Sequence, residues 1–113
     1  MTTMQMKVHD LEPALVLVVE DLDRKANLNG VASWRIIGKL RGVLVVDGPP
    51  VSVVVDPVDT WKATLTRAWV AGETDTAGDM RVEAEAMWPG TPPRPQTFPS
   101  ASSETVRFNP DLG

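Results

Sequence analysis

Apolar and polar side chains alternate along two segments that flank one glycine-bearing loop, residues 71–78. In the first segment, residues 59–70, Trp61 and every second residue to Leu65 are apolar, and the residues between them are polar. In the second segment, residues 79–88, charged residues alternate with apolar ones over most of the length. A period of two is typical of β-strands that bury one face. Both segments are therefore predicted strands with one side in a core.

The loop between these two segments is expected to close a β-hairpin. In the register that keeps the tryptophans in the core, three pairs face inward: Trp61 with Trp88, Ala63 with Ala86, and Leu65 with Ala84. Large aromatic residues with alanines between them pack well against a second sheet. A slip of one residue would turn the tryptophans toward solvent, so the hydrophobic pattern favours this register.

Further short strands are predicted between turn signals such as Asn29-Gly30. Residues 14–20 are apolar on both faces, so this strand is expected in the centre of a sheet. The other predicted strands span residues 4–8, 31–40, 43–46, 51–55 and 104–108. Short strands separated by closely spaced turns indicate an all-β sandwich or barrel. No segment is predicted to be helical.

Length and composition limit how the chain is organised. Its 113 residues are enough for one domain, residues 1–113. Residues 89–103 are rich in proline, which cannot donate to a β-ladder, so this stretch is expected to be an extended loop within the domain. The sequence contains no cysteine, which excludes disulfides, thiolate metal sites and cysteine nucleophiles.

Charge and hydropathy exclude several classes of partner. The net charge of −4 argues against a nucleic-acid-binding protein, which must neutralise phosphates. No apolar run approaches the roughly 20 residues that a membrane helix needs. Residues 1–9 carry too little apolar length for a signal peptide. The chain is therefore expected to be made without an export signal and to bind neither nucleic acid nor a membrane.

Candidate catalytic residues are few. His9 is the only histidine, and a lone histidine near an N-terminus is typical of a surface position. No Gly-x-Ser-x-Gly motif is present, so a serine triad is not predicted. An acidic cluster has the composition for acid–base chemistry or for a divalent cation, but it is interpreted as a solvated turn. This cluster consists of Glu12, Glu20, Asp21 and Asp23.

One loop partly imitates a calcium-binding loop. Starting at Glu73, it carries acidic residues at its first, third and seventh positions and a glycine at its sixth. Ala77 and Ala84 occupy the fifth and twelfth positions, where a calcium loop places oxygen ligands. The glycine is therefore interpreted as a turn residue. The sequence predicts no catalytic residue, no metal site and no cofactor.

Four tryptophans and no tyrosine are unusual in a chain of this length. A row of exposed tryptophans binds sugars or stacks on bases, but all four lie on predicted core faces, which indicates packing. Trp69 and Trp88 lie near strand ends and are expected to be partly exposed. A carbohydrate-binding module that uses these two residues is therefore the more distant alternative for function.

Three segments together resemble one phage family. Residues 21–30 and the following strand resemble a D-x-D-G turn that leads into a strand, with Arg24 at the position of the glycine. Residues 69–86 resemble a hairpin that begins with tryptophan and continues through Asp-Thr and a glycine, with Met80 at the position of an aromatic residue. Thr97-Phe98-Pro99-Ser100, followed by residues 104–108, resembles the ending of the same domain. In this order, the segments are similar to the N-terminal domain of the baseplate upper protein of tailed phages.

The resemblance implies a fold and a function. The family fold is an immunoglobulin-like antiparallel β-sandwich, here with about seven or eight short strands. The implied function is that of a non-enzymatic structural protein that docks in multiple copies on the tail, neck or baseplate of a virion. Since the sequence ends at Gly113, the anchoring domain is expected to act alone. Its expected partners are other phage structural proteins and further copies of itself, after synthesis in the host cytoplasm. A capsid decoration protein bound to the lattice of the major capsid protein is the alternative.

Contact residues are predicted from edge position and exposure. Residues 4–8 and 43–46 are expected to be edge strands that extend a neighbour's sheet by β-augmentation. The proline-rich stretch is preorganised and loses little entropy on docking. The predicted contact residues are Met4, Met6, Val8, Val43, Val45, Pro92, Pro93 and Phe98.

Overall fold

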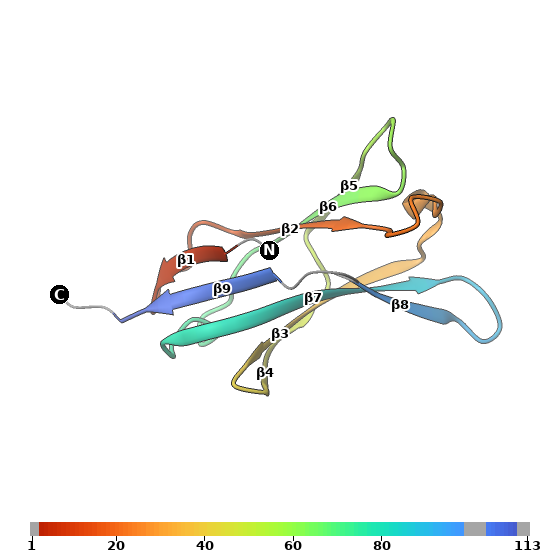
Figure 1. Ribbon diagram of the computed structural model, residues 1–113. Helices are drawn as coiled ribbons and strands as arrows, with labels where there is room; N and C mark the ends of the chain where they lie inside the picture. Colours follow the sequence, from red (N-terminus) through yellow and green to blue (C-terminus); the bar gives the residue numbers. More distant parts are fainter. Residues whose placement is uncertain (1–2, 99–103, 111–113) are drawn as a thin grey trace.

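The computed structural model describes residues 3–98 and 104–110, which form two β-sheets packed on one core (Figure 1). Over these residues the chain has nine strands and a single turn of 3-10 helix, Leu28–Gly30. The strands are β1 Thr3–Lys7, β2 Leu15–Glu20, β3 Ser33–Leu40, β4 Val43–Gly48, β5 Ser52–Val55, β6 Lys62–Arg67, β7 Gly78–Trp88, β8 Arg94–Phe98 and β9 Glu104–Asn109. The predicted all-β sandwich is confirmed.

The larger sheet is built around the long strand β7. Its strands follow the order β1-β9-β7-β3-β4. One side of β7 is shared by two strands: β9 pairs with its first half and β8 with its second half. β1 runs parallel to β9, whereas the other described pairs are antiparallel. β1 and β4 lie at the two ends of the sheet, which confirms that residues 4–8 and 43–46 contribute edge strands.

The smaller sheet has the order β2-β6-β5, and it shows that the predicted hairpin is wrong. β6 pairs with β2 and β5, whereas β7 belongs to the larger sheet. The chain between β6 and β7 therefore crosses from one sheet to the other. Alternation identifies the buried face of a strand but not its neighbour, and these two strands bury their faces in the same core from opposite sheets.

The core lies between the two inner faces and contains most of the residues that the alternation predicts. Trp61, predicted to face inward, is instead half-buried and outside the core cluster, with the guanidinium carbon of Arg24 4.9 Å from its ring centre. Ala63 and Leu65 of β6 belong to the same buried cluster as Met80, Val82 and Ala84 of β7. The buried apolar residues also include Leu15, Leu17, Val19, Leu28, Ile36, Leu40, Val46, Ala86, Val106 and Phe108. Because both sheets contribute to this cluster, each sheet buries its apolar face against the other.

Two further predictions differ from the structure. β2, expected in the centre of a sheet, lies at an edge of the smaller sheet and leaves Val16 and Val18 exposed. The described part of residues 89–103 is not a loop throughout, because it includes β8, where Pro95 lies opposite Met87. Proline is tolerated there because β8 is an edge strand, where the missing N–H can face away from the ladder. The remainder of that stretch, residues 99–103, lies outside the described residues.

Candidate docking surfaces

The structure separates the predicted contact residues into three groups. Val43, Pro92 and Pro93 are exposed, and Met4, Val8 and Val45 are half-buried. Met6 and Phe98 are core residues, so the exposure from which they were predicted as contact residues is absent. Both residues point inward from their strands, and the ring centre of Phe98 lies 5.8 Å from that of Trp34.

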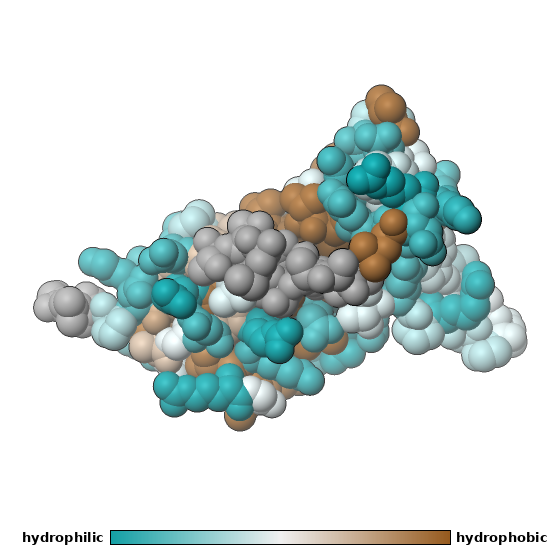
Figure 2. Space-filling view, in the orientation of Figure 1, coloured by the Kyte–Doolittle hydropathy of each residue, from teal (hydrophilic) through white to brown (hydrophobic). Residues whose placement is uncertain are grey.

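The outer face of the smaller sheet is a surface that the sequence reading missed. Val18 of β2, Thr64 of β6 and Val54 of β5 form one row across the sheet, next to a row that contains Val16 and Thr66. The exposed fractions of the three valines are 55% for Val16, 48% for Val18 and 61% for Val54. Figure 2 shows apolar surface along β2. We name these five residues the valine face.

Both edges of the smaller sheet are open. β2 and β5 are the end strands, and each pairs only with β6 among the described strands. Open edges are commonly protected by lysine, proline or a bulge, but residues 15–19 of β2 are all leucine or valine. The sequence signal for this surface was the apolar run in residues 14–20. A strand in the centre of a sandwich and an edge strand that a partner covers are both apolar on two faces, so this apolar run does not distinguish the two positions.

The tryptophans have partners within the chain. Trp69 is buried, donates from Nε1 to the backbone oxygen of Pro13 at 3.0 Å, and packs edge-on against Phe108. Trp88 is half-buried and donates from Nε1 to Oε1 of Gln96 at 2.9 Å. The expectation of partial exposure is therefore wrong for Trp69, which removes one of the two residues needed for a sugar-binding surface.

Carboxylates of the calcium-like loop are engaged with cations of the chain itself. Glu73 accepts two hydrogen bonds from Arg67, at 2.7 and 2.8 Å. Asp79 accepts from Arg107 at 2.8 Å, and Oδ1 of Asp75 lies 3.1 Å from Nδ1 of His9. Among the residues that the structure describes, no group of three or more potential ligands is placed to hold a metal ion. The loop acts instead as a structural connection between the sheets.

Asp21 organises the turn after β2, the first of the three segments that resemble the phage family. Its Oδ2 accepts from the backbone N–H groups of Ala26 at 3.0 Å and Lys25 at 3.1 Å, and its Oδ1 accepts from Gln96 at 3.3 Å. These hydrogen bonds, first of all that from Ala26, hold the pKa of Asp21 below its usual value of 3.8. Arg24, at the glycine position of the family motif, has a φ of 55°, a left-handed conformation that glycine adopts most easily.

Replacing Asp21 by asparagine is expected to make stability less dependent on acid pH. A carboxylate whose pKa is lowered by folding stabilises the fold above about pH 4, and this contribution is lost as the pH falls through the lowered value. At neutral pH, Asp21→Asn should therefore cost roughly 1 kcal/mol, and its stability should approach that of the wild type near pH 2. Urea unfolding across this range measures the effect. Asp23→Asn, an exposed neighbour, is the control, and equal behaviour of both variants would contradict the assignment.

Comparisons with known proteins give no match for this chain. No family model, no curated protein and no solved structure matches the chain. No helix in residues 3–98 or 104–110 is long and apolar enough to cross a membrane. The candidate surfaces are therefore identified from the structure alone. They are the valine face, the open edges of the smaller sheet and the charged outer face of the larger sheet.

Proposed function

We propose that this protein is a non-enzymatic structural component of a tailed-phage virion, docking in multiple copies on the tail, neck or baseplate. The observation that carries the proposal is the valine face on a sheet with two open edges. An exposed apolar patch on a soluble domain marks a contact surface. An unprotected edge strand offers backbone groups to a neighbouring chain. Together these features favour a protein whose function is to bind a partner that covers the valine face and pairs with an edge strand.

The docking mechanism follows from the arrangement of β2. A strand of a partner that pairs with β2 forms backbone hydrogen bonds and extends the smaller sheet. The same partner then covers the outward valines, and covering each half-exposed valine contributes roughly 1 kcal/mol. Such contacts are weak for one copy, but a symmetric assembly that repeats them holds each copy through several neighbours at once.

The phage resemblance supports the choice of assembly. Its first segment forms the turn that Asp21 stabilises, and Arg24 there has the backbone conformation that suits the family's glycine. Its second segment begins at the buried Trp69 and continues into β7, but it is the crossing between the two sheets and not the hairpin that the resemblance implied. Its third segment contributes β8 and β9, on either side of residues outside the described range. The three resembling segments therefore correspond to structural parts of the sandwich.

A capsid decoration protein is the alternative, because a lattice of capsid subunits offers equally repeated sites for the valine face. The carbohydrate-binding alternative is weakened by the burial of Trp69. Neither alternative requires catalysis, and both use the same fold, so location in the particle separates them.

Fractionation of virions tests the proposal. Particles of the phage that encodes this chain are purified, heads and tails are separated, and the chain is quantified in each fraction by mass spectrometry. A constant copy number in the tail fraction is the expected result. Hundreds of copies in the head fraction would identify a decoration protein instead. Absence from both fractions would contradict a role in the virion.

A further inference from the structure

The outer face of the larger sheet carries several cations, and two of them have carboxylate partners. Arg35 of β3 forms a double contact with Asp47 of β4. Arg107 of β9 donates to Asp79 of β7, with Nε and Oδ1 2.8 Å apart. On this face, cations beside carboxylates are therefore neutralised within the sheet.

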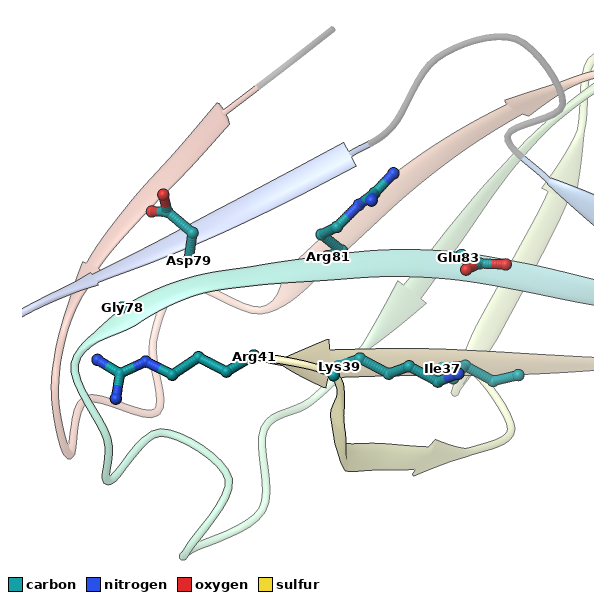
Figure 3. Close-up of a pocket in the computed structure, with 8 residues that line it drawn as sticks. Ile37, Lys39, Arg41, Gly78, Asp79, Arg81 and Glu83 are labelled. Carbon is teal, nitrogen blue, oxygen red and sulfur yellow. The ribbon is translucent and has the colours of Figure 1, made fainter.

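Three other cations on the same side are not neutralised in this way. Lys39, Arg41 and Arg81 line one hollow between β3 and β7, together with the carboxylates Asp79 and Glu83 (Figure 3). We name the three cations the basic hollow. Lys39 lies directly opposite Arg81 in the ladder. Like charges in this position destabilise a sheet. Among the described side chains, none of the three forms an ion pair.

The position of Arg41 depends on the backbone around it. Arg41 has a φ of 51° in the tight turn between β3 and β4. Its side chain lies against Gly78, where an added Cβ would be 4.0 Å from Nε and Nη2 of Arg41 and 3.2 Å from a methyl group of Leu40. A glycine at the start of β7 thus leaves room for Leu40 and for the guanidinium group. The turn and the glycine together hold a third cation at the Gly78 end of the hollow, where its side chain points away from Lys39 (Figure 3).

The chemistry of the hollow indicates the kind of ligand it suits. An anion placed between Lys39 and Arg81 would relieve the repulsion between these two charges. The net charge of −4 already favours solubility, so solubility does not explain why two cations lie opposite each other. The exposed Leu44 lies opposite Lys39 on the next strand, so apolar contact is available beside the charges. Glu83 and Asp79 also line the hollow, Asp79 being paired with Arg107, and Glu85 follows on the same face, so closely spaced negative charges such as a continuous row of phosphates are disfavoured. Separate carboxylates with apolar residues between them fit better than nucleic acid does.

We propose that the basic hollow binds an extended acidic segment of a partner protein. The proposal rests on the proposed function in one respect, since the partner is taken to be another component of the assembly. It adds the chemistry of that partner: aspartate or glutamate side chains that reach Lys39, Arg41 and Arg81, with an apolar residue over Leu44. This surface lies on the larger sheet and is separate from the valine face, so one copy is able to contact two neighbours.

A fluorescent peptide of alternating glutamate and leucine tests the proposal on the full chain by fluorescence anisotropy. Saturable binding is expected at low salt, with weaker binding at physiological salt because exposed charges are screened. Lys39→Gln and Arg81→Gln should each reduce affinity by about fivefold. The matched control is Arg94→Gln, an exposed arginine of β8 outside the hollow, which should change affinity by less than about twofold.

Unfolding of the same variants separates binding from folding. Because Lys39 and Arg81 repel each other, removing either charge should leave the urea midpoint unchanged or raise it. Absence of saturable binding by the wild type at low salt would overturn the proposal, as would an equal loss of affinity in Arg94→Gln. Tighter binding of an oligothymidylate of the same length would overturn it in favour of nucleic acid. The peptide assay needs no virion, so its failure leaves the fractionation experiment as an independent test of the proposed function.

Discussion

Glu73→Ala is expected to destabilise the protein by about 3–5 kcal/mol, the range for removing one partner of a buried ion pair. The Arg67 side chain is only 9% exposed and that of Glu73 only 12%. Glu73 accepts both hydrogen bonds from Arg67 and a third, at 2.8 Å, from the backbone N–H of Val70. Alanine would leave the guanidinium group buried without its counterion and would release the start of the crossing between the sheets.

Urea unfolding followed by tryptophan fluorescence measures this effect. Glu83→Ala is the control, because Glu83 is exposed on the outer face, and its cost should stay within about 0.5 kcal/mol. Replacing the pair together, as Arg67→Met with Glu73→Leu, should restore much of the lost stability, since no buried charge is then left alone. A cost below about 1 kcal/mol for Glu73→Ala would show that the pair is solvated.

Phe98→Ala is expected to cost about 3–5 kcal/mol, the range for removing a buried phenylalanine ring. Phe98 is completely buried, lies opposite Ala84 in the ladder and packs on Trp34. The ring therefore fixes β8 to the core. The effect is measured by the shift of the urea midpoint.

Thr97→Ala is the matched control for that measurement. Thr97 precedes Phe98 on the same strand, and its side chain is exposed, so its replacement should cost no more than about 0.5 kcal/mol. If both variants kept wild-type stability, β8 would be loosely attached, and Phe98 would again be a candidate for contact with a partner.

The sequence allowed the faces of strands to be predicted more securely than their neighbours. Alternation assigned Leu65 and Val82 to the core, and both are buried. It did not reveal that β6 and β7 belong to different sheets, because both bury the same kind of face in one core. The position of Pro95 was also misjudged, since proline excludes a central strand but not an edge.

The candidate surfaces were harder to predict than the fold. The valines of β2 belong to an apolar run, and such a run has the same composition whether another layer of the protein or a partner covers it. The opposition of Lys39 and Arg81 depends on the pairing of β3 with β7, two strands that are far apart in the sequence. By contrast, the turn after β2 was indicated by Asn29-Gly30, because its hydrogen bonds are local.

Competition for places in the particle tests the central proposal, that this chain is a virion protein and that the valine face is its docking surface. Wild type and the triple variant Val16→Thr, Val18→Thr and Val54→Thr are produced together during phage assembly, and their ratio in purified virions is measured by mass spectrometry. Threonine keeps the shape of valine, and the three sites are exposed, so the fold should persist. The control is Val58→Thr with Val70→Thr, which changes exposed valines outside the face.

The triple variant should be depleted at least about tenfold, because a total loss of about 1.4 kcal/mol or more of contact energy has this effect. The control should enter particles as the wild type does. Equal incorporation of the triple variant and the wild type, with equal stability of the two proteins, would contradict the account.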